Sequence, residues 1–248
     1  MPSRRQVVLG GSLSLLWLAQ PQCAHASSSL APHSPGCLLA EADNAQVFAR
    51  VAQKDVIVHS EDGAFDRRLA NVLATLSDLF GILPGFGYYD DSGSRNAFAS
   101  REAGLGRSDG SVLMGINFLA SLRELAEYPE VAIAGVCAHE FGHVLQFRRG
   151  LIAQLNEGQP TVKRSELQAD YFAGYFVGSQ RKIRPDYPAA VVAFAQYNYG
   201  DTDYGNPNHH GTPEERGAAV VAGFQAAAEQ GLGIDDAVAA SLQYVLAL

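Results

Sequence analysis

The feature that most constrains this chain is a pair of histidines, His139 and His143, inside an apolar segment with helical spacing. Apolar residues recur through positions 131–145, so we expect a helix there. A separation of four residues places both imidazoles on one helix face, one turn apart. From that face both rings can reach one ion at about 2.0–2.1 Å, the usual zinc–nitrogen distance. Glu140 lies about 100° around the helix from His139, where it can reach a water on the metal but is not positioned as a ligand.

A catalytic zinc ion needs a third protein ligand and one open position. A metzincin would have glycine and histidine at positions where this chain has Gln146 and Arg149, so that class is excluded. Glu166 and Asp170 are again four residues apart in a helical segment, and Glu166 can complete a site of two histidines and one glutamate. Asp170 can accept the free ring N–H of a ligand histidine. The alternative is two solvated carboxylates, but aromatic residues within 172–176 indicate a buried segment, where unpaired acids are costly.

The spacing of apolar residues along the chain predicts an α+β fold. Short strand-like segments at 86–89, 96–99 and 111–114 indicate a small antiparallel sheet. Nearly everything after them has helical spacing, so we expect a single, mostly helical metal-binding domain over residues 41–248. The expected helices cover residues 38–53, 64–80, 117–127, 130–148, 162–183, 187–198, 213–229 and 234–247.

One helix start is predicted by local chemistry. Thr212 can cap the helix, and Pro213 suits its first turn. Glu215 stands where the second half of a capping box belongs. We therefore expect a helix to begin at residue 213.

The first 26 residues have the layout of a secretory signal peptide. Arg4 and Arg5 precede an apolar run at 7–19, and Ala24 and Ala26 stand where a signal peptidase requires small residues. The paired arginines resemble a twin-arginine signal, while a Sec signal and an uncleaved membrane anchor are the alternatives. We expect an exported protein, periplasmic or secreted, with residues 27–40 as a loose leader rich in Ser, Pro and Ala.

Composition and charge narrow the range of partners. The net charge is −8 and no basic run is present, so we expect no nucleic-acid partner. Beyond the signal segment, no apolar run has the length of a membrane span, so we expect the mature chain not to cross a membrane. Cys37 and Cys137 could form one disulfide in an oxidising compartment, or Cys137 could remain a buried thiol on the metal-site helix.

The two helical motifs together resemble a known family. HEFGH at 139–143 followed by ELQADYFAG at 166–174 is similar to the gluzincin metallopeptidases, particularly the HtpX-like and CAAX prenyl protease family, and also to bacterial neutral zinc metallopeptidases. The segments 96–99 and 110–114 resemble the strands before the family's metal helix, and 210–216 resembles its downstream histidine, turn and helix with an arginine. The likeness runs from about residue 63 to about residue 225. Many members carry membrane helices, so this chain resembles a soluble, exported branch.

The resemblance implies a zincin-like fold and a role for each matching residue. One zinc ion would be held by His139, His143 and Glu166, with Glu140 as the base and Asp170 behind a ligand histidine. His210 would donate to an oxyanion or coordinate zinc in a resting state, although His209 competes for either role and a polar loop residue is the alternative. An edge strand packed on the helical region would bind substrate backbone through Asn96, Ala97, Phe98 and Ala99.

These features predict an exported zinc endopeptidase that hydrolyses peptide or protein substrates with a metal-activated water. Two alternatives stay open: a catalytically silent zinc-binding or chaperone-like protein, and a zinc amide hydrolase with a non-peptide substrate. A cysteine nucleophile is not expected, because neither Cys37 nor Cys137 has a plausible adjacent base in the sequence.

Overall fold

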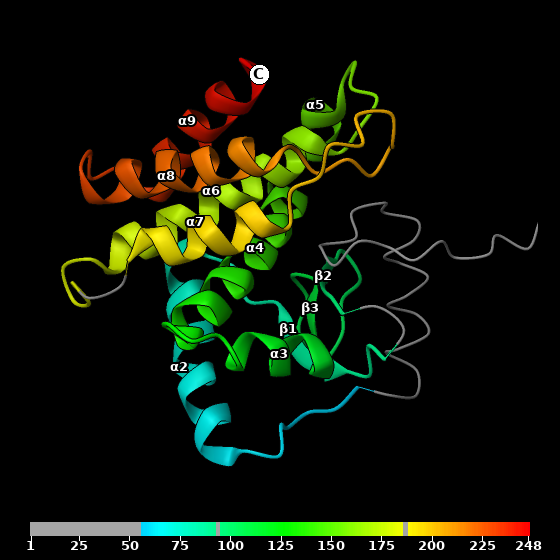
Figure 1. Ribbon diagram of the computed structural model, residues 1–248, viewed down its shortest axis with the longest axis vertical. Helices are drawn as coiled ribbons and strands as arrows, with labels where there is room; N and C mark the ends of the chain where they lie inside the picture. The colour runs from blue at the N-terminus through cyan, green and yellow to red at the C-terminus, as the bar shows by residue number, and fades with distance from the viewer. Residues whose placement is uncertain (1–55, 93–94, 186–187) are drawn as a thin grey trace, which may run out of the picture. The chain divides into compact units, whose positions relative to one another are not determined.

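The computed structural model describes residues 56–92, 95–185 and 188–248, which belong to one compact unit. The expected signal peptide, leader and helix at 38–53, together with Cys37, lie outside these residues. The fold is α+β, mostly helical, with a small three-stranded mixed sheet (Figure 1). Its elements, in order, are α2 (Gly63–Phe80), β1 (Gly85–Tyr89), β2 (Ala97–Ser100), β3 (Ser111–Gly115), α3 (Ile116–Arg123), α4 (Pro129–Arg149), α5 (Ile152–Asn156), α6 (Lys163–Gln180), α7 (Ala189–Asn198), α8 (Pro213–Ala228) and α9 (Ile234–Leu246).

Local signals account for both ends of α2. The Asp62 carboxylate accepts hydrogen bonds from the backbone N–H groups of Ala64 and Phe65, both at 3.0 Å. Such a side-chain cap satisfies donors that the first helical turn leaves unpaired. Gly81 ends the helix in the left-handed region, with φ of 65°, which glycine adopts without strain. The helix predicted at 64–80 is therefore confirmed.

The sheet differs from the prediction in the order and direction of its strands. β3 lies between β1 and β2, pairing parallel with β1 and antiparallel with β2. The expectation of an antiparallel sheet is therefore wrong for the β1–β3 pair. Apolar alternation predicts where strands occur, but it does not predict which strands pair. Here β2 pairs with β3 on the side opposite β1, and it does not pair with β1. Among the described strands, β2 is an edge strand, as expected.

Helix α4 lies at the centre of the packing. It contacts β2 and β3 as well as α2, α3, α6 and α7 (Figure 1). Every residue from Val131 to Phe147 is buried, so this helix has no solvent-facing side over most of its length. Its polar side chains therefore have to be satisfied inside the protein. Cys137 is a free, buried thiol on this helix, and burial raises its pKa to about 12.

Two helices approach closely because they meet at glycines. A Cβ on Gly174 of α6 would overlap the carbonyl oxygen of Val220 on α8. A Cβ on Gly223 of α8 would overlap the carbonyl oxygen of Tyr171 on α6. Only glycine allows the two backbones to come this near. This close packing brings the start of α8 towards the polar residues of α6.

The predicted helix start at residue 213 is confirmed. The Glu215 N–H donates to Thr212 Oγ1 at 3.2 Å, and the Thr212 N–H donates to Glu215 Oε2 at 2.8 Å, which completes the capping box. Helices α3, α4, α6, α7, α8 and α9 lie where they were expected, whereas the short α5 was not predicted. Of the helices in the described part of the chain, none has the length and apolar character needed to cross a membrane.

Candidate metal centre

The two motif histidines face each other inside the protein. The Nε2 atoms of His139 and His143 lie 3.0 Å apart, with the ring planes at 90°. The two side chains are 3% and 0% exposed, respectively. One turn of α4 therefore presents two imidazole nitrogens to the same buried point, as the spacing predicted.

Glu166 of α6 completes the cluster. Its Oε2 lies 3.4 Å from His139 Nε2, and its Oε1 lies 3.5 Å from His143 Nε2. Each of the three residues offers a ligand atom, and these atoms all lie within 4.8 Å of one another. Neither buried oxygen of Glu166 accepts a hydrogen bond from any residue that the structure describes. Both carboxylate oxygens thus remain available as acceptors beside two imidazole nitrogens, and this donor set fits a metal ion.

Hydrogen bonds on the other ring nitrogens orient both imidazoles. His139 Nδ1 lies 2.8 Å from Asp170 Oδ1, and His143 Nδ1 lies 2.9 Å from Gln146 Oε1. The Gln146 amide nitrogen donates to the Ser165 carbonyl oxygen at 2.7 Å, which leaves its oxygen to accept from His143. With both Nδ1 atoms engaged in this way, Nε2 is the ring nitrogen that each histidine directs at the cluster. This is the usual arrangement of histidines that bind metals.

Arg216 connects three helices behind the cluster. From α8, its Nε and Nη2 donate to Asp170 Oδ2 and Oδ1 at 2.7 and 2.9 Å. Nη2 also donates to Gln196 Oε1 on α7 at 3.0 Å and lies 3.6 Å from Glu166 Oε2. The Arg216 side chain is only 1% exposed. A two-pronged guanidinium–carboxylate pair fixes Asp170, and through it the ring of His139.

Sequence reasoning assigned no function to Gln146 or Arg216. Gln146 appeared only as a departure from the metzincin pattern, although its distance of three residues from His143 is a helix-neighbour spacing that could have revealed the contact. Arg216 appeared only within the segment that resembles the gluzincins. Its role depends on the packing of α8 against α6, which has no local sequence signal.

The electrostatics of the cluster keep its carboxylates ionised. Burial opposes the charged form of Glu166, but attraction to His210 and to the two motif histidines outweighs it and holds its pKa well below the usual range. Burial likewise opposes ionisation of Asp170, and the Arg216 guanidinium with the His139 contact lowers its pKa on balance. Both carboxylates are therefore negative at neutral pH.

The two imidazoles differ in basicity. Burial disfavours protonation of His139, yet Asp170 and Glu166 outweigh it and raise its pKa to about 10. Burial is the largest influence on His143 and lowers its pKa to about 4. Because metal ligation requires neutral imidazoles, protonation of His139 would compete with a metal ion at this cluster.

Glu140 lies beside a small cavity next to the cluster. Its side chain is buried, and it lines this cavity together with His139, Asn96 and Ala97. The volume is about 20 Å³, which is room for one water molecule. The structure thus brings the proposed base and the start of β2 to the same place.

The four residues of the expected substrate strand are not equivalent. Asn96 and Ala97 line the cavity at Glu140, whereas Phe98 packs in a separate apolar cluster with Tyr89. Ala99 belongs to the main core. All four residues are at most 3% exposed. In this conformation none of the four residues is open to a substrate.

The two candidate histidines after α7 lie in different surroundings. His209 Nδ1 is 2.5 Å from Asp201 Oδ1, and its ring lies against Tyr204 with centroids 5.1 Å apart. The backbone N–H of His210 donates to Asp201 Oδ2 at 3.1 Å. Of the charges that lower the pKa of Glu166, His210 has the largest effect. The His210 ring also approaches the Asp201 carboxylate, with Nδ1 3.7 Å from Asp201 Oδ2, so the two histidines share one acidic partner.

Comparison with protein-family models, with curated proteins and with solved structures finds no match to this chain.

Proposed function

We propose that this chain is an exported, zinc-dependent endopeptidase of the gluzincin type, with a zincin-like fold. The observation that carries the proposal is the buried Glu166 carboxylate, which has no described hydrogen-bond donor and lies 3.4 and 3.5 Å from two oriented imidazole nitrogens. Two nitrogens and one carboxylate form the ligand set of catalytic zinc sites that keep an open position. His139, His143 and Glu166 would hold the ion.

The adjacent residues suit hydrolysis of an amide. When bound, zinc supplies Lewis-acid polarisation of a carbonyl and lowers the pKa of water. Glu140, at the edge of a cavity with room for one water, would accept a proton and pass it to the leaving amine. His210 would donate to the developing oxyanion.

The start of β2 would receive the substrate once the region around Asn96 opens. Asn96 and Ala97 line the same cavity as Glu140, so a peptide following the β2 backbone would bring its carbonyl to the base. Main-chain hydrogen bonds of this kind bind extended peptides largely independently of their side chains. We therefore propose a peptide or protein as the substrate.

A second candidate function is a zinc-binding protein without catalytic activity. The small cavity favours it, because about 20 Å³ accommodates a water molecule but no peptide. Catalysis would require the region around Asn96 and Glu140 to open. The two candidate functions use the same metal ligands and differ only in whether the site hydrolyses a substrate.

The experiment that tests the proposal measures metal content and proteolysis on the same preparation of the full chain. Elemental analysis should give one zinc ion per chain, and casein cleavage should stop after chelation and return with added zinc. Casein cleavage that persists after complete metal removal would overturn the proposal. One bound zinc ion with no cleavage of casein or of a random peptide library would favour the silent zinc-binding protein.

A further inference from the structure

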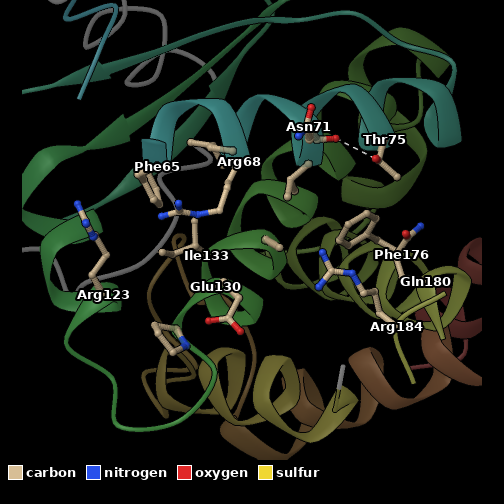
Figure 2. A pocket seen from close by; sticks show the side chains of 14 residues that line it. Phe65, Arg68, Asn71, Thr75, Arg123, Glu130, Ile133, Phe176, Gln180 and Arg184 are labelled. Atoms are coloured by element: carbon tan, nitrogen blue, oxygen red, sulfur yellow. Dashed lines mark hydrogen bonds between the residues drawn. The ribbon is translucent and has the colours of Figure 1, made fainter. Parts of the chain in front are cut away.

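A larger cavity lies apart from the metal centre. Its volume is about 540 Å³, and it is lined by residues of α2, the first turns of α4 and the end of α6, together with Arg123 of α3 (Figure 2). None of His139, His143, Glu140 or Glu166 lines it. Cavities that bind small molecules have volumes of about 300–1,000 Å³, so this one is large enough for a ligand.

The floor of this cavity is apolar. Phe65 and Leu69 come from α2, Ile133 and Ala134 from α4, and Phe176 from α6. Each of these residues is at most 8% exposed, so they form part of the packed core and hold a fixed shape. A hydrocarbon or aromatic group lying on them would lose contact with water at little cost in protein reorganisation.

The rim of this cavity is positively charged. Arg68, Arg123 and Arg184 line it, against a single acidic residue, Glu130. In Figure 2, Arg68 extends from α2 and Arg184 from the segment after α6, both towards the apolar residues of the floor. The whole chain has a net charge of −8, whereas the three guanidinium groups make the rim of this cavity locally positive. Such a rim attracts anions.

The arginines differ in how they are engaged. Arg123 donates to Asp62 at 2.9 Å, and its guanidinium lies 4.8 Å from the centre of the Phe65 ring. Arg68 makes no hydrogen bond or ion pair with any residue in the described ranges. Arg123 is therefore held within the wall, whereas Arg68 has all its donors available to a ligand.

We propose that this cavity binds a small amphiphilic carboxylate, such as a medium-chain fatty acid. Its apolar body would lie on Phe65, Ile133 and Phe176, and its head would contact Arg68 and Arg184. The planar guanidinium fork matches a carboxylate in two-pronged geometry. Glu130 on the same rim disfavours anions of higher charge, which favours a singly charged head. This site is independent of the proposed peptidase activity.

The test uses isothermal titration of the full chain with dodecanoate below its micelle concentration. Wild type should bind one dodecanoate saturably, while dodecyltrimethylammonium, with the same tail and opposite charge, should not bind in this way. The double variant Arg68→Gln/Arg184→Gln should weaken dodecanoate binding at least tenfold. The matched control, Arg67→Gln/Lys182→Gln, removes the same charge from the same two segments outside the cavity lining, and its affinity should stay within twofold of wild type.

Three results would overturn the proposal: no saturable binding of dodecanoate, equal binding of both amphiphiles, or equal affinities of the two double variants. Arg68 and Arg184 are exposed, so their substitution should leave the fold intact. Circular dichroism melts of both double variants check this. A second variant, Asn71→Trp, places a large ring at an exposed position of the lining and should also weaken binding, without any change of charge.

Discussion

Arg216 donates two hydrogen bonds to the carboxylate of Asp170, at 2.7 and 2.9 Å, and both side chains are almost completely buried. The same carboxylate contacts His139 Nδ1 at 2.8 Å. One ion pair therefore joins α8 to α6 and, through the imidazole, to α4. The stability of the protein and the geometry of the candidate metal centre depend on the same contact.

Replacing Arg216 with methionine should destabilise the protein severely. The variant leaves the Asp170 carboxylate buried without its cation, and losing one partner of a buried ion pair costs about 3–5 kcal/mol. Urea denaturation of the metal-free protein measures the free energy of unfolding. The control is Arg149→Met, which breaks an exposed pair with Asp235 of the same 2.7 Å length and should cost less than about 1 kcal/mol. Equal losses in the two variants would contradict the role assigned to Arg216.

Replacing Gln146 with methionine should weaken zinc binding by about 10- to 100-fold, the range seen when a partner of a ligand histidine is removed. The variant takes away the acceptor for His143 Nδ1, so the ring loses its fixed orientation. Competition with a fluorescent zinc chelator measures the dissociation constant.

Gln168→Met is the matched control for that variant. Gln168 is also buried, but its amide donates to Ser241 Oγ at 2.9 Å, away from both histidines. The control should lose stability while keeping its zinc affinity. If both variants bind zinc equally well, the contact between Gln146 and His143 does not orient a ligand.

Much of the candidate site could be predicted because it depends on local periodicity. The spacing of four residues placed His139 beside His143 and Glu166 near Asp170, and the fold had only to bring two helices together. The start of α8 was equally local, since Thr212 and Glu215 form the capping box within four residues. Such features persist in almost any tertiary arrangement of the helices.

What could not be predicted depends on contacts between distant segments. The pairing of β1 with β3 is one example, because strand patterns carry no information about order in the sheet. The link between Asp170 and Arg216 is another, since 46 positions separate them. This contact forms only because glycines of α6 and α8 let the two helices approach closely. A glycine within a helical pattern does not indicate which helix will pack against it.

Replacing Gly223 with alanine should therefore destabilise the protein by about 3 kcal/mol or more, at the upper end of overpacking effects. The added Cβ would overlap the backbone carbonyl oxygen of Tyr171, which cannot rotate away as a side chain would. Thermal and urea unfolding give the loss. Gly205→Ala is the control, because no atom lies within 4 Å of its added Cβ. A Gly223→Ala protein as stable as the control would contradict the close packing of α6 on α8.

Replacing Glu140 with glutamine should abolish turnover while leaving the metal bound. The side chain keeps its size but can no longer accept the proton, and general-base catalysis contributes about 10²- to 10⁴-fold. Glu140 lines the small cavity without belonging to the ligand cluster, so zinc content should remain at one ion per chain. Cleavage of casein, with zinc measured on the same sample, separates the two effects. Glu124→Gln, at an exposed position, is the control for loss of one charge. A Glu140→Gln protein that cleaves casein at the wild-type rate would show that another group serves as the base.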